Sequence, residues 1–131
     1  MASRSLLRRG FTLIELLIVV VIIGILATIA IPKFANTKGK ALQASMVSDL
    51  RNLASAQEGY FYEKGNYTTT LADLSFSPSA NVTITITNAA GAGWVGIATS
   101  SMLPGRSCGL FMGNVVGATA PAVREGVVRC E

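Results

Sequence analysis

The chain begins with a short polar segment, continues with an unbroken apolar run, and then changes to mixed apolar and polar positions. The run, FTLIELLIVVVIIGILATIAI, covers Phe11 to Ile31 and holds one charged residue, Glu15. About 20 apolar residues in an α-helix span the ~30 Å hydrocarbon core of a bilayer. The run therefore predicts a membrane-spanning helix. It is longer than the apolar region of a secretory signal peptide, and no strong small-x-small cleavage site follows it.

Beyond this run, apolar residues recur at steps of mostly three and four, which is the spacing of one face of a helix. This stripe consists of Leu42, Met46, Leu50, Leu53, Ala54 and Phe61. The charged residues of the segment fall mainly elsewhere, so we interpret the stripe as core packing.

Together, the run and the stripe predict one helix from Phe11 to about Tyr62. At 1.5 Å per residue it is roughly 75–80 Å long. Gly24 is a weak point in this helix. At Pro32 we expect a bend, because proline lacks the N–H donor and its ring crowds the preceding turn.

After Gly65 the composition shifts to Thr, Ser, Asn, Gly and Ala. Strict alternation of apolar and polar residues predicts a first strand, and later segments predict three more. The predicted strands are 82–87, 94–100, 109–112 and 126–130, with a turn at 88–93, loops at 66–80 and 118–122, and a helical turn at 71–74. The fold class is therefore α+β: a long N-terminal helix packed on a small antiparallel sheet.

Composition and charge narrow the function. The chain has 131 residues, of which 50% are hydrophobic and 14% charged, so it is a single ordered domain rather than a disordered chain. Arg4, Arg8 and Arg9 precede the apolar run and favour a cytoplasmic N-terminus. Without these three arginines, the chain has eight basic and seven acidic residues, a net charge of +1. A basic nucleic-acid-binding surface on the remainder therefore has little support, and we expect no clear nucleic-acid site.

Little in the sequence suggests catalysis. The absence of histidine removes the commonest general base and most zinc sites. Asp49, Glu58, Glu63 and Asp73 are scattered, and we interpret them as solvated charges. We expect no enzymatic activity, no cofactor and no metal site.

The residues Arg8-Arg9-Gly10-Phe11-Thr12-Leu13-Ile14-Glu15 resemble the processing site of type IV prepilins and of type II secretion pseudopilins. The resemblance covers the basic leader, the glycine, the phenylalanine, the acid fifth after the glycine and the apolar stretch. Pro32 also falls where many pilins have a helix-kinking proline. A looser similarity extends over residues 60–67 and 71–74.

The resemblance implies a maturation pathway and a domain organisation. Residues 1–10 would be a leader that a prepilin peptidase removes by cutting between Gly10 and Phe11, after which it methylates the Phe11 amine. Residues 11–32 would form the transmembrane and filament-core half of the helix. Residues 33–131 would form the head, with an αβ-loop at 63–81 and the sheet at 82–131.

The resemblance also implies a role for Glu15 in assembly. In a filament core, a lone carboxylate is heavily penalised, and an opposite charge attracts it strongly. The implied partner is the Phe11 amine of a neighbouring subunit, with a hydrogen bond added by Thr12, which together set the subunit register. Two alternatives remain: Glu15 pairs with its own N-terminus, or it is protonated in the membrane.

The two cysteines, Cys108 and Cys130, lie across the membrane by this topology, where thiols oxidise. We expect them to form a disulfide rather than two buried thiols. The resemblance supports this placement, because a C-terminal disulfide staples the last strand of many type IV pilins.

Three functional hypotheses follow. The first is a type IV pilin that polymerises with itself into an extracellular filament for adhesion, motility or DNA uptake. Its partners would be the prepilin peptidase, the pilus assembly platform and, before assembly, the bacterial inner membrane. The second is a type II secretion pseudopilin. The cysteine pair and the lack of an acidic calcium-site tail favour the first over the second. The third is a membrane-anchored binding module or enzyme.

Overall fold

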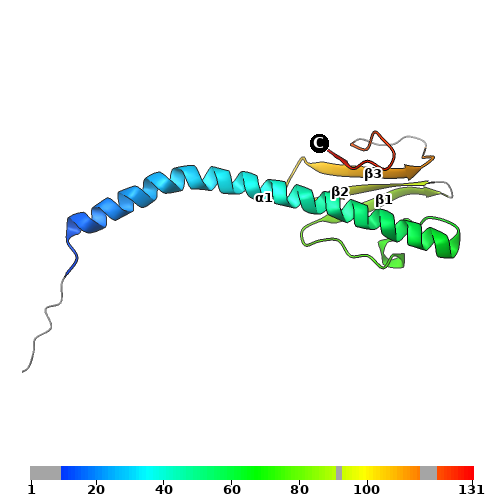
Figure 1. The fold of residues 1–131 in the computed structure, drawn as a ribbon, viewed down its shortest axis with the longest axis horizontal. Coiled ribbons are helices and arrows are strands. Elements are labelled where there is room, and N and C mark those ends of the chain that lie inside the picture. The colour runs from blue at the N-terminus through cyan, green and yellow to red at the C-terminus, as the bar shows by residue number, and fades with distance from the viewer. Residues whose placement is uncertain (1–9, 91–92, 116–120) are drawn as a thin grey trace, which may run out of the picture. The chain divides into compact units, whose positions relative to one another are not determined.

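The computed structural model describes residues 10–90, 93–115 and 121–131. In chain order it contains a long helix, a short 3-10 helix and four strands (Figure 1). Their bounds are α1 Leu13–Lys64, η1 Leu71–Asp73, β1 Thr83–Ala90, β2 Gly93–Thr99, β3 Ser107–Gly113 and β4 Arg129–Cys130. The predicted α+β fold, with one long N-terminal helix and an antiparallel sheet, is confirmed.

Helix α1 is 52 residues long and ends two residues later than predicted. Gly65 terminates it: its φ is +77°, and its N–H donates to the Phe61 carbonyl over 2.8 Å. Glycine adopts this left-handed conformation without a Cβ clash, which is why it so often follows a helix. The αβ-loop therefore begins at residue 65 rather than 63. Residues 24 and 32 both lie inside the continuous helix, and the bend at Pro32 stays a prediction.

The four strands form one antiparallel sheet in the order β1-β2-β3-β4. Strand β1 shows the predicted alternation, with its isoleucines buried and the threonines between them exposed. Two boundaries were predicted wrongly. Strand β1 continues to Ala90, through a register irregularity after Thr87, where a turn was expected. Strand β4 has only two residues, because 124–126 form a bend and turn in which Gly126 has a φ of +70°. Most of the predicted 118–122 loop lies outside the described residues.

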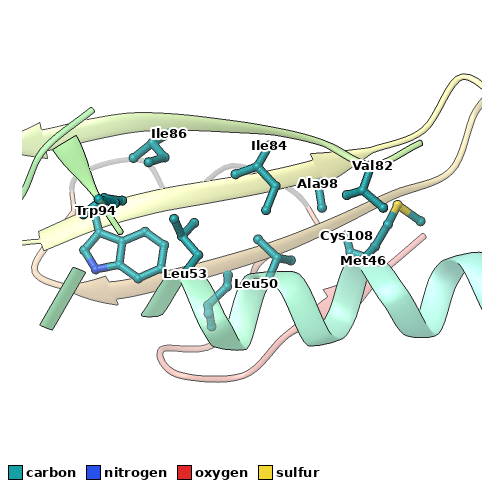
Figure 2. Close-up of a cluster of buried hydrophobic side chains, with 11 residues drawn as sticks. Met46, Leu50, Leu53, Val82, Ile84, Ile86, Trp94, Ala98 and Cys108 are labelled. Carbon is teal, nitrogen blue, oxygen red and sulfur yellow. The ribbon is translucent and has the colours of Figure 1, made fainter. Parts of the chain in front are cut away.

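The core lies between the second half of α1 and the sheet (Figure 2). Met46, Leu50 and Leu53 are completely buried, as the helical stripe predicted. They contact side chains from just before β1 and from the first three strands, namely Val82, Ile84, Ile86, Trp94, Ala98, Cys108 and Leu110. The stripe's edge members Leu42 and Ala54 are only partly buried.

Two polar side chains share the buried face of α1, which the apolar stripe did not predict. Asp49 is 3% exposed, and its two oxygens accept hydrogen bonds from the backbone N–H and the hydroxyl of Ser79, both at 2.8 Å. Gln57 is fully buried; its Nε2 donates to the Thr68 carbonyl over 2.6 Å, and its Oε1 accepts from the Thr68 N–H over 3.2 Å. The expectation that Asp49 is solvated was wrong, because these bonds replace its water. Both side chains fasten the αβ-loop to the helix.

Candidate functional site

The first half of α1 exposes an apolar surface of unusual extent. An 18-residue window of the helix has a mean hydropathy of 3.0, and none of it is buried. By length and composition α1 is the one helix, among the described residues, that is able to cross a membrane. The large apolar side chains from Phe11 to Phe34 are all exposed, with Phe11 itself at 84%. Soluble monomers rarely expose a continuous apolar patch of this kind, so it marks a surface that lipid or protein covers.

The start of α1 is organised around Glu15. The Oε2 atom of Glu15 accepts hydrogen bonds from the Thr12 N–H at 2.9 Å and from the Thr12 hydroxyl at 2.7 Å. In return, the Glu15 N–H donates to the Thr12 hydroxyl oxygen over 3.2 Å. This is a capping box, in which a threonine before the helix and a glutamate three residues later satisfy each other's backbone donors.

The spacing Thr-x-x-Glu is the sequence signature of a capping box, so this local role of Glu15 was predictable in addition to the intersubunit role implied by the resemblance. The structure brings Thr12 and Glu15 together within one chain. Both bonds to the carboxylate end on Oε2, and its Oε1 has no hydrogen-bond partner among the described residues. The arrangement thus leaves one carboxylate oxygen for a further donor.

The bond between Gly10 and Phe11 lies just before this cap. Both residues are exposed and belong to no helix or strand. A Cβ placed on Gly10 would meet no atom within 4 Å, so nothing packs against this position. The leader arginines Arg8 and Arg9 lie outside the described residues. The Gly10–Phe11 bond is therefore accessible from the solvent side and independent of the helix.

The disulfide belongs to the second of the two compact units into which the chain divides, residues 1–37 and 38–131. Cys108 of β3 and Cys130 of β4 are covalently joined, as predicted, and neither cysteine is free. They are also register partners in the sheet. Two backbone hydrogen bonds between Ser107 and Glu131, at 3.2 and 3.0 Å, continue this pairing to the C-terminus.

The remaining candidate residues do not form a reaction centre. Among residues 10–90, 93–115 and 121–131, no three His, Cys, Asp or Glu side chains gather to hold a metal ion. Glu58, Glu63 and Asp73 are exposed, as expected. The Glu58 carboxylate accepts a hydrogen bond from the Tyr67 hydroxyl at 3.0 Å. Burial raises the pKa of Tyr67, and the negative charge of Glu58 and of Glu125 raises it further.

Comparison with known proteins places these features in a family context. Residues 6–31 match the model of the prokaryotic N-terminal methylation motif. The chain is 47% identical over 70 residues to the type IV major pilin protein PilA of Myxococcus xanthus. It is 41% identical over 76 residues to the type II secretion system core protein G of Klebsiella pneumoniae. It is also 36% identical over 102 residues to the fimbrial protein EcpC of Eikenella corrodens.

These similarities cover 53%, 56% and 72% of this chain respectively. They span only 32%, 54% and 63% of the lengths of the three relatives. The resemblance to type IV prepilins and type II secretion pseudopilins is confirmed by the motif and by these names. None of the names is that of an enzyme, in agreement with the expectation of a structural protein.

Proposed function

We propose that this chain is a structural subunit of a type IV pilus that polymerises through the apolar first half of α1. The observation that carries the proposal is the combination at the start of that helix. A continuous, exposed apolar surface follows an accessible Gly10–Phe11 bond and a capped carboxylate at Glu15. A helix of this kind is stable only where lipid or other copies of itself cover it.

In this proposal the subunit is first inserted in the membrane, then processed, and then assembled. The leader holds the N-terminus at the cytoplasmic face of the inner membrane, and residues 11–32 span the bilayer. A prepilin peptidase cuts after Gly10 and methylates the Phe11 amine. The assembly platform then moves the subunit from the membrane into an extracellular filament, where neighbouring helices replace lipid around the apolar surface. Pro32, and Gly24 before it, allow the helix to bend as it leaves the bilayer.

Glu15 sets the register between subunits in this proposal. Its Oε2 atom is held by Thr12, which fixes the direction of the carboxylate, while Oε1 remains to accept a hydrogen bond from the Phe11 amine of a neighbouring subunit. Both charges are removed from water in the filament core. Removing either charge from water without the other is energetically unfavourable, and the attraction between the paired charges offsets this desolvation cost. An incoming subunit is therefore stabilised only at the axial position where the two groups meet.

A type II secretion pseudopilus is the second candidate function, supported by the 41% identity to a secretion system core protein. Three observations favour the pilus. Identity to the major pilin is higher, at 47%, the similarity to a fimbrial protein extends over 72% of the chain, and the head carries a C-terminal disulfide.

The test is deletion of the gene, complementation, and electron microscopy of the cell surface. We expect long surface filaments that disappear on deletion and return on complementation, and mass spectrometry of the filament should show a methylated N-terminus at Phe11. A secretion defect without surface fibres would favour the pseudopilus. Loss of neither filaments nor secretion would contradict both functions.

A further inference from the structure

The second half of α1 carries a groove on a different face from its core residues. It has a volume of about 550 Å³ and is formed by one face of the helix, with Lys40, Gln43, Ala44, Val47, Ser48, Arg51 and Asn52 as its lining. The small apolar residues Ala44 and Val47 alternate with polar side chains, and the two charged members, Lys40 and Arg51, are both cationic and exposed. The groove thus presents a shallow surface with two positive charges.

A second, smaller hollow lies nearer the C-terminal end of the same helix. Its volume is about 210 Å³, and it is lined by Ala56, Gly59, Tyr60, Glu63, Asp73, Leu74 and Ser75. Its two charged members, Glu63 and Asp73, are both anionic and exposed. We call the first surface the basic groove and the second the acidic hollow. They have no residue in common.

Four carboxylates of this unit accept hydrogen bonds from uncharged donors. Ser79 binds Asp49, the Tyr67 hydroxyl binds Glu58, the Thr68 hydroxyl binds Asp73 over 2.9 Å, and the Gly113 N–H binds Glu125 over 2.7 Å. A hydrogen bond from an uncharged group does not cancel the charge of a carboxylate as a cationic partner would. None of these four hydrogen bonds involves Lys40 or Arg51, so these four carboxylates do not pair with the two cations of the basic groove.

We infer that the basic groove of one copy of this chain binds the acidic hollow of another copy. The chain itself carries the complementary charges, two against two, on surfaces that a copy is able to use at the same time. A contact between two different surfaces of identical subunits is heterologous, and when its rotation does not close a ring it generates an open helical filament. The inference rests on the proposed polymerisation and adds a contact between heads to the helix contacts at Glu15.

Helix geometry gives this contact an approximate axial offset. The groove is centred near residue 46 and the helical part of the hollow near residue 60. At 1.5 Å per residue, these centres are about 20 Å apart along the helix axis. Two copies with parallel helices that make this contact are therefore displaced by about 20 Å.

Cysteine crosslinking between two differently marked copies tests the contact directly. Ser48→Cys marks the groove with a nearly isosteric residue, and Gly59→Cys marks the hollow at a position where an added Cβ meets no atom within 4 Å. Cells that produce both single variants should yield a mixed dimer with a thiol-specific crosslinker. The matched control replaces Gly59→Cys with Ser101→Cys, an exposed position in the turn after β2. We expect at least about tenfold more mixed dimer from the first pair than from the control pair.

Charge reversal tests the chemistry of the same contact. Arg51→Glu and Glu63→Lys should each lower the mixed-dimer yield at least about tenfold. Each reversal places like charges opposite each other across the interface, and the resulting loss of binding free energy exceeds the loss that corresponds to a tenfold weaker contact. Combining Arg51→Glu with Glu63→Lys should recover most of the yield. Arg106→Glu, which reverses the charge of an exposed residue outside both surfaces, should change the yield little.

The outcomes separate this inference from the proposed function. Crosslinking is measured in whole cells, where it detects the contact in a pilus and in a pseudopilus alike, whereas microscopy decides which polymer is present. Normal filaments with crosslinking no higher than the control would overturn the inference alone. Loss of DNA binding in Arg51→Glu cells with unchanged crosslinking would assign the groove to nucleic acid instead and would also overturn it.

Discussion

Breaking the disulfide between Cys108 and Cys130 should strongly destabilise the head, even though β4, the strand that the disulfide holds, is very short. Strand β4 has two residues, so few backbone hydrogen bonds hold the C-terminus to β3. The disulfide joins residues 22 positions apart. Without it, the unfolded chain regains the freedom of that whole segment. The folded segment is then held to β3 by the short ladder and by two further hydrogen bonds, from the Gly126 N–H to the Phe111 carbonyl and from the Gly113 N–H to Glu125.

The size of the effect follows from the length of the closed segment. In the chain-entropy model, a loop of this length stabilises the folded state by about 3 kcal/mol relative to the open chain. The head belongs to a unit of fewer than 100 residues, in which 1 kcal/mol corresponds to about 4–8 °C in melting temperature. We therefore expect the Tm of the head to fall by about 12–24 °C.

Trp94 provides the assay, because it is the only tryptophan of the chain and is completely buried. Its fluorescence in the full-length protein, solubilised in detergent, reports unfolding of the head. The protein is compared oxidised, reduced, and with both cysteines replaced by alanine. Reduction keeps both sulfur atoms, so it separates the loss of the crosslink from the cavity that Cys108→Ala leaves in the core. If the unfolding free energies of the reduced and oxidised proteins differ by less than about 1 kcal/mol, the reasoning is refuted.

Four further changes test the other parts of the structure. Gly10→Leu should block removal of the leader, and mass spectrometry that finds a normal mature N-terminus would contradict this. Glu15→Ala should leave membrane insertion and cleavage intact but greatly reduce filament number in electron micrographs; normal numbers would show that this carboxylate does not drive assembly. Asp49→Ala should lower the unfolding free energy of the head by about 2 kcal/mol, because it removes a charged acceptor of two hydrogen bonds, and urea titration of Trp94 fluorescence measures this. Gly96→Ala should cost about 1–3 kcal/mol in the same titration, since its new Cβ would lie 2.8 Å from a methyl group of Leu53 and 2.9 Å from the Trp94 ring.

Periodicity predicted the long helix and its buried stripe because both depend on local spacing. Met46, Leu50 and Leu53 follow the steps of three and four that place side chains on one helix face, and all three are in the core. The end of the helix was placed two residues early because Glu63 and Lys64 were assigned to the loop, whereas the stop is the left-handed glycine at 65.

Long-range hydrogen bonds were not predictable in the same way. Nothing in the sequence around Asp49 indicates that Ser79, 30 residues away, donates two hydrogen bonds to it. The same holds for Gln57 and Thr68, whose pairing depends on the path of the αβ-loop. At the candidate site the situation was reversed. The Thr12–Glu15 cap is local and was readable from its spacing, yet a long-range role for the same carboxylate dominated its interpretation.

The start of α1 at Leu13 has a consequence for the leader. The capping box at the start of the helix uses Thr12 and Glu15, and both residues lie after the Gly10–Phe11 bond. Cleavage between Gly10 and Phe11, as proposed above, would leave these three hydrogen bonds in place. In the proposed pathway, the leader could therefore vary in length and composition without disturbing this cap, whereas the residues after the cleavage site must also form the helix and its contacts in the filament.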